Sequence, residues 1–113
     1  MDDCLFCSIV AGDVPAEVVH VTERTVAFRD INPQAPTHVL VVPREHHRDA
    51  AALAAADPQA SAELVTTAAA VAAAEGHAEA YRLVFNTGAG AGQTVFHAHL
   101  HVVAGRDLGW PPG

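Results

Sequence analysis

Three histidines alternate with apolar residues near the C-terminal end of the chain, in the segment His97-Ala98-His99-Leu100-His101. A spacing of two residues on a β-strand points side chains to the same face, so the three imidazoles are expected to share one face. A neutral imidazole can act near pH 7 as a nucleophile, an acid or a base. A single histidine here would favour an ordinary polar strand position, but three in register favour a chemical role.

A glycine-rich segment, residues 86–92, precedes the histidines and continues into Gln93 and Thr94. Glycine lets the backbone approach an anion closely, and successive N–H groups can surround phosphate oxygens. The segment is not a lysine-dependent phosphate loop, because the chain contains no lysine. A plain flexible connection is the alternative interpretation. The histidines nearby favour a phosphate site.

Cys4 and Cys7 are the two cysteines of the chain, and their spacing is typical of half a zinc site. Structural zinc takes four ligands, so two more must come from elsewhere, and the candidates are His46, His47 and His97. A redox dithiol is one alternative, although the surroundings lack the strand and long helix of a thioredoxin-like motif. A local disulfide is another. Zinc is the favoured interpretation.

Two further polar residues flank a proline-containing loop, residues 30–37. His38 begins an apolar run and, taken alone, is interpreted as a histidine satisfied within a loop or the core. The Asp30 carboxylate could accept hydrogen bonds from two ribose hydroxyl groups, but an aspartate before such a loop more often starts a turn. Neither residue indicates a function by itself.

Length and charge limit the class of protein. The 113 residues fit a single domain, residues 1–113. A net charge of −7 argues against nucleic-acid binding, which needs a basic surface, but permits a small anionic ligand held by backbone N–H groups. No apolar run is long enough to cross a membrane, and no signal segment is recognisable. A cytoplasmic protein is therefore expected.

The hydrophobic pattern predicts an α+β fold with an antiparallel sheet. Helix is predicted over residues 4–11 and, after a break at Asp57-Pro58, over about 59–75, with a short helical turn before the break. The predicted strands are 17–22, 25–29, 38–42, 81–85 and 96–103. The last of them carries the three histidines.

With these residues in view, the sequence resembles the histidine-triad superfamily and is most similar to its branch of nucleotide-binding proteins, which are purine nucleoside phosphoramidases. The resemblance runs from about Leu5 to Gly113. It rests on FRDINPQAPTHVLVVPREH (28–46), YRLVFNTGAGAGQTVFHAHLHVVAGR (81–106) and WPPG (110–113). It implies a five-stranded antiparallel sheet with one short N-terminal helix and one main helix. It also implies a homodimer in which two sheets join into a continuous sheet of ten strands.

The resemblance assigns chemical roles to three histidines. It implies that His99 attacks the α-phosphate of a purine nucleotide and carries a nucleotidyl intermediate. His101 supports the α-phosphate, and His38 orients or relays protons. Asp30 holds the ribose hydroxyl groups.

Other residues are implied to surround the nucleotide. The phosphate site includes Asn86, Gly92 and Thr94, and Thr94 stands where close relatives often have serine. Trp110 lies in a tail that reaches the partner's active site and affects leaving-group preference. The apolar slot for the purine base comprises Leu5, Phe6, Ile9, Phe28, Ile31 and Leu40.

Bacterial members of the group imply a zinc site. Its ligands here are Cys4, Cys7, His46 and His97, which assigns His97 to structure, while His47 leaves the third ligand open. Positioned donors replace magnesium in the implied reaction, so no magnesium requirement is expected.

The implied activity is hydrolysis of purine nucleoside 5′-phosphoramidates, or related AMP derivatives, at phosphorus–nitrogen or phosphoric anhydride bonds. One alternative is a dinucleoside polyphosphate hydrolase or nucleotidyl transferase of the same superfamily, although the WPPG tail favours the phosphoramidase branch. Another alternative is a zinc-stabilised nucleotide-binding module whose role is regulatory and not catalytic.

Overall fold

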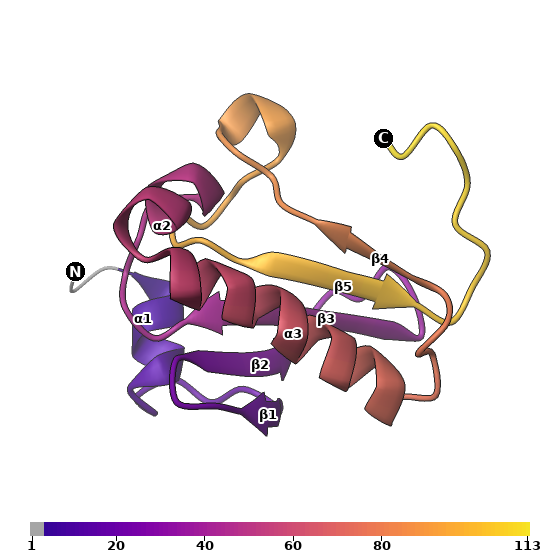
Figure 1. The fold of residues 1–113 in the computed structure, drawn as a ribbon, viewed down its shortest axis with the longest axis horizontal. Coiled ribbons are helices and arrows are strands. Elements are labelled where there is room, and N and C mark those ends of the chain that lie inside the picture. The colour runs from indigo at the N-terminus through magenta and orange to yellow at the C-terminus, as the bar shows by residue number, and fades with distance from the viewer. Residues whose placement is uncertain (1–3) are drawn as a thin grey trace.

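In the part of the chain that the structure describes, five strands form one antiparallel sheet in the order β1-β2-β3-β5-β4. The computed structural model describes residues 4–113 (Figure 1). The strands are β1 (Val18–Val21), β2 (Thr25–Arg29), β3 (Thr37–Pro43), β4 (Tyr81–Val84) and β5 (Leu100–Ala104). The predicted α+β class and five-stranded sheet are confirmed.

Within residues 4–113, three α-helices accompany the sheet: α1 (Leu5–Val10), α2 (Ala50–Ala56) and α3 (Pro58–Ala74). The Asp49 carboxylate accepts a hydrogen bond from the Ala52 N–H at 2.9 Å, and that of Asp57 accepts one from the Ala60 N–H at 3.0 Å. These contacts satisfy N–H groups that the first helical turn leaves free. Pro58 fits the start of α3 because its missing N–H would have no partner there. The predicted break at Asp57-Pro58 is confirmed.

The larger part of the core lies between α3 and the sheet. In Figure 1, α3 runs across one face of the strands, and it buries Leu64, Ala68 and Val71. Small alanine side chains let the helix approach the sheet closely. The strands contribute buried Ala27, Val39, Val41, Leu100 and Val102 to the same cluster.

The opposite face of the sheet packs against α1. Phe6 of α1 is buried in a second cluster with Phe28, Leu40 and Val42. Every residue of β3 is buried because its odd and even positions face different layers, Val39 and Val41 on the α3 side and Leu40 and Val42 on the α1 side. The apolar run therefore forms the buried strand that the sequence predicts.

The strand predicted over residues 96–103 is wrong at its beginning, since β5 starts only at Leu100. The N–H of Ala98 bonds the carbonyl of His47 at 2.7 Å instead of a β3 carbonyl. Pro43 at the end of β3 has no N–H with which to extend the ladder. The side chains still alternate, because Ala98 and Leu100 join the α3-side core.

Two further segments complete the chain. The glycine-rich loop contains a short 3₁₀ turn, η1 (Ala89–Ala91), and the tail after β5 has no regular structure and extends away from the sheet (Figure 1). Gly76 has a φ of +87° just after α3, a conformation that glycine adopts without strain. Within residues 4–113, no helix is both long and apolar enough to span a bilayer.

Candidate active site and metal centre

A cavity of about 280 Å³ lies on the α1 side of the sheet. Its walls are mostly apolar, with an acidic and a histidine-bearing rim, as is typical of small-molecule sites. Among the residues implied to hold the nucleotide, the lining includes Leu5, Phe6, Ile9, Phe28, Asp30, Ile31, Leu40, Thr94, His99 and His101. The fold therefore gathers most of the predicted site residues around one space.

His99 lies in this cavity with one ring nitrogen held. Its Nδ1 is 2.7 Å from the carbonyl of His97, and because a carbonyl only accepts, Nδ1 carries the proton and donates it. The lone pair is then on Nε2. Burial lowers the pKa of His99, so the ring is neutral near pH 7. A buried neutral imidazole with a free Nε2 lone pair is a competent nucleophile.

His101 and His38 form a hydrogen-bonded pair whose proton positions follow from the donors around them. The N–H of Gln34 donates to Nδ1 of His38 at 3.0 Å, so the proton of His38 is on Nε2. That Nε2 lies 2.9 Å from Nδ1 of His101 and donates to it. His101 therefore carries its own proton on Nε2, where it can be donated to a bound molecule.

The His101 ring is strongly biased toward its neutral form. Burial is the largest cause, followed by repulsion from His99 and His38, and together they lower the pKa of His101 to about 4 against a smaller attraction from Asp30. At pH 7 the pair therefore presents a neutral Nε2–H donor.

Asp30 starts a turn and also lines the cavity, while its contact with ribose hydroxyl groups stays a prediction. One carboxylate oxygen accepts the Asn32 N–H at 2.8 Å, which makes Asp30 a turn-starting residue. The other oxygen lies 3.5 Å from Nε2 of His38, and the residue lines the cavity. The carboxylate is thus fixed at the rim by the turn that it stabilises.

Gln93 holds the glycine-rich loop in place, a role that sequence reasoning did not predict. Its side chain is buried, accepts the Gly88 N–H at 2.8 Å and donates to the carbonyls of Arg48 and Val95. These bonds tie the glycine-rich loop to the segment that leads to the histidines. A polar residue that follows a run of glycines directly was the available signal.

Asn86, Gly92 and Trp110 do not line the cavity. Asn86 lies beside Gly92 and faces a second hollow of about 260 Å³, which His38 and His101 also line. Trp110 is 84% exposed. A role for these three residues in nucleotide binding stays a prediction.

A cluster of cysteine and histidine residues lies next to the cavity. Cys4, Cys7, His46 and His97 bring one ligand atom each within 4.8 Å of one another. Nδ1 of His97 lies 3.4 Å from the Cys4 sulfur and 3.5 Å from the Cys7 sulfur, and Nδ1 of His46 lies 3.5 Å from the latter. The cysteines are not joined in a disulfide. His47 is not part of this cluster.

The donor set fits zinc. Two thiols and two imidazoles are the ligands of many tetrahedral zinc sites. Nε2 of His97 donates to the Pro43 carbonyl at 2.9 Å, which leaves the Nδ1 lone pair toward the sulfurs. Holding the far ring nitrogen in this way is how proteins orient metal-binding histidines.

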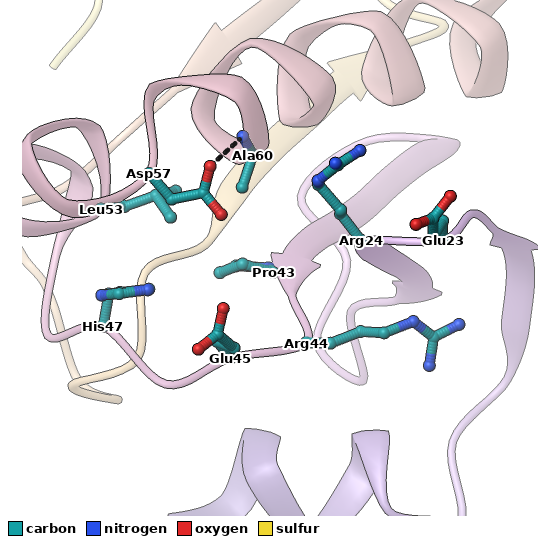
Figure 2. Close-up of a pocket in the computed structure, with 9 residues that line it drawn as sticks. All are labelled: Glu23, Arg24, Pro43, Arg44, Glu45, His47, Leu53, Asp57 and Ala60. Carbon is teal, nitrogen blue, oxygen red and sulfur yellow. Dashed lines mark hydrogen bonds between the residues drawn. The ribbon is translucent and has the colours of Figure 1, made fainter.

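Another hollow of about 260 Å³ lies near α2 (Figure 2). Charged side chains such as Arg24, Glu45 and Asp57 surround it, and Asp57 is already engaged in capping α3. It shares no lining residue with the His99 cavity.

The fold and the site together define a small α+β protein that holds His99 and His101 against a mostly apolar cavity, with His38 hydrogen-bonded to His101 and a zinc-type cluster alongside. The family model described as the HIT domain matches residues 11–108. The chain belongs to the HIT domain family.

Individual relatives agree with this assignment. A solved structure of a HIT family hydrolase from Legionella pneumophila is 46% identical and covers 98% of this chain and 100% of its own, with a TM-score of 0.94. The purine nucleoside phosphoramidase of Escherichia coli is 39% identical over 96% of this chain and 92% of its own length. A 14 kDa zinc-binding protein of Zea mays is 40% identical over 96% of this chain and 87% of its own.

Proposed function

We propose that the protein is a hydrolase that cleaves purine nucleoside 5′-phosphoramidates, or related AMP derivatives, through a nucleotidyl intermediate on His99. The observation that carries this proposal is the bond from His99 Nδ1 to the His97 carbonyl, which leaves Nε2 as a nucleophile in the cavity. The E. coli relative named a purine nucleoside phosphoramidase supports the substrate class.

The cavity suits a purine nucleoside. The aromatic rings of Phe6 and Phe28, 5.4 Å apart between centroids, offer an apolar wall to the base. Ile31 is 99% exposed at the rim and gains burial if a base packs on it. The oriented carboxylate of Asp30 is available to the ribose hydroxyl groups. Thr94, which lines the cavity, would contact the phosphate together with N–H groups of the glycine-rich loop, and Asn86 and Gly92 would complete the phosphate site.

The reaction has two steps. In the first, Nε2 of His99 forms a bond to the α-phosphorus of a substrate protonated on its leaving nitrogen, the bond to that nitrogen breaks, and the nitrogen leaves as a neutral amine, while the neutral Nε2–H of His101 donates a hydrogen bond to a phosphoryl oxygen. In the second, water attacks the phosphorus, the bond to His99 breaks with its electron pair returning to Nε2, and one proton of the water passes to solvent. The bond from His38 holds His101 in the tautomer that makes this donation.

Zinc has a structural role in this proposal. Cys4, Cys7, His46 and His97 would hold the ion, which supplies a cross-link between α1 and the segment before β5 and takes no part in the chemistry. The link matters for the site, because Phe6 of α1 packs on the His99 ring at 5.0 Å between centroids.

We also propose that the protein is a homodimer. β4 is an edge strand with one unpaired side, and two copies joined there would form a continuous sheet. The exposed Trp110 would then be available to a partner. Light scattering after size-exclusion chromatography should give twice the chain mass, and a monomer at micromolar concentration would refute the dimer.

Steady-state kinetics with two substrates test the proposed function. An adenosine 5′-phosphoramidate should be hydrolysed with a kcat/KM at least about a hundredfold above that of a diadenosine polyphosphate. A reversed order would favour the polyphosphate hydrolase alternative. Binding of both without turnover would favour a regulatory module.

A further inference from the structure

The two cysteines of the chain lie one helical turn apart. Cys4 is the residue before α1 and Cys7 is in its first turn, where the Cys7 N–H donates to the Cys4 sulfur at 3.3 Å. The two sulfur atoms lie within 4.8 Å of each other. A disulfide between them therefore needs a local closure within one turn and no movement of the sheet.

The two thiols differ in their access to solvent. Cys4 is buried, with 9% of its surface exposed, whereas Cys7 is half-buried. A small oxidant therefore meets Cys7 first, and Cys4 is the one other thiol in the chain. A thiol that coordinates zinc is deprotonated, and the thiolate is the form that attacks an oxidant. Cys7 is thus placed as the attacking cysteine and Cys4 as the resolving one.

The cysteines also anchor a wall of the nucleoside cavity. Leu5 and Phe6 of α1 line that cavity, and the Phe6 ring packs on the His99 ring at 5.0 Å between centroids. In the part of the chain that the structure describes, the polar side-chain contacts between this segment and other elements are those of the cysteines with His46 and His97. A helix of six residues is not stable alone, so its position depends on these contacts and on its apolar packing.

We propose that Cys4 and Cys7 are a site of reversible oxidation by a peroxide, at which formation of a disulfide releases zinc and loosens the α1 wall of the cavity. The inference rests on the zinc site and the nucleotide cavity of the proposed function. The metal and the disulfide exclude each other, because oxidation leaves His46 and His97 as two ligands where structural zinc takes four.

The oxidation balances with hydrogen peroxide as the oxidant. The Cys7 thiolate attacks one peroxide oxygen and the O–O bond breaks, which gives a sulfenic acid and hydroxide. The Cys4 thiolate then attacks the Cys7 sulfur, the S–S bond forms, and a second hydroxide leaves. The sulfurs lose two electrons to the peroxide, and two protons from solvent convert the hydroxides to water. A dithiol reductant reverses the oxidation by thiol–disulfide exchange, after which zinc can bind again.

Titration of the zinc-loaded protein with hydrogen peroxide tests the proposal. Zinc release is followed with a chromophoric chelator, the disulfide by intact mass and peptide mapping, and the fold by the melting temperature. One zinc ion should leave for each disulfide formed, the mass should fall by the two hydrogens lost, and the melting temperature should fall to that of the chelated protein. The dissociation constant of AMP should rise roughly fivefold as the Phe6 wall loosens. A dithiol with added zinc should restore all four properties.

Cys7→His is the matched variant, because it keeps four zinc ligands and cannot form the disulfide. It should retain zinc and its melting temperature under the same peroxide treatment. His47→Ala, whose residue lies outside the cluster, should be oxidised as the unmodified protein is. If Cys7→His does not fold, the zinc release and peptide mapping of the unmodified protein still decide the outcome.

Zinc that stays bound after the disulfide has formed would overturn the proposal, and so would oxidation of the cysteines to sulfinic acid without a disulfide. Equal sensitivity of a folded Cys7→His variant would also contradict it. Loss of zinc with unchanged affinity for AMP would refute the link to the cavity. A reduced protein that does not bind AMP would count against the proposed function, whereas zinc release and the disulfide would still decide the oxidation.

Discussion

His97 and His99 are two residues apart and both buried, yet they present opposite ring nitrogens. A main-chain carbonyl holds Nε2 of His97 and turns its Nδ1 toward two thiols, whereas another carbonyl holds Nδ1 of His99 and leaves Nε2 to the cavity. The side chains are chemically identical. The carbonyl that each ring meets therefore decides whether an imidazole suits a metal or a phosphorus atom.

The largest effect on activity is expected from replacing His99, the member of this pair that faces the cavity. His99→Gly should lower kcat/KM for an adenosine phosphoramidate by about a thousandfold or more, because no other group supplies the nucleophile. The melting temperature should change little by comparison. Steady-state kinetics and a thermal scan of the same preparation check this. Near-normal turnover would remove His99 from the chemistry.

Loss of the contacts within the Cys4, Cys7, His46 and His97 cluster should lower thermal stability. Chelation of the metal, or Cys7→Ser, should lower the melting temperature by roughly 10 °C, because the link between α1 and the segment before β5 is lost. His47→Ala is the matched control, since His47 is next to His46 but outside the cluster. A purified protein without stoichiometric zinc, and with unchanged melting after chelation, would contradict the structural role.

Sequence reasoning captured the elements better than the junctions between them. Alternation correctly predicts that His97, His99 and His101 share one face, which is the α1 side of the sheet. It cannot show that β5 pairs with β3 only from Leu100 onward, because Pro43 and the His47 carbonyl belong to distant segments. Local patterns predict α3 and the break at Asp57-Pro58 well, since both depend on neighbouring residues.

The site residues also differ in how well the sequence predicts them. The resemblance points to His46 as a ligand, and the structure places it, not His47, beside Cys7. Gln93 was missed because its three partners come together only in the fold. Trp110 makes no contribution to the cavity of its own chain, and its role in a partner's site stays a prediction.

An effect of intermediate size is expected from pH. His101 has its pKa lowered to about 4 from an ordinary 6.5 by burial and by His99 and His38, opposed by Asp30. As pH falls, His101 is therefore protonated in the unfolded chain before it is protonated in the folded chain. The stability that neutral His101 contributes is complete above pH 6.5 and is lost between pH 6.5 and pH 4.

Urea unfolding at pH 7 and pH 4 measures this loss, which should be on the order of 2 kcal/mol for His101. His101→Asn should flatten that part of the pH dependence. An equally steep loss in the variant would show that other groups carry it.

The smallest effect is expected at Phe6, which contacts both His97 and His99. Phe6 packs edge-on against both rings, with centroids 6.0 Å from His97 and 5.0 Å from His99. Phe6→Leu should cost about 1 kcal/mol of stability and raise KM several-fold with little change in kcat. A change in kcat alone would show that Phe6 orients His99 instead of forming the base pocket.

Intact-mass spectrometry of the protein mixed rapidly with an adenosine 5′-phosphoramidate tests the assignment of His99 most directly. The account predicts a transient mass increase of one adenylyl group, which peptide mapping places on His99 and which the His99→Gly variant lacks. An adduct on His97 or His101, or turnover with no adduct at any mixing time, would contradict it.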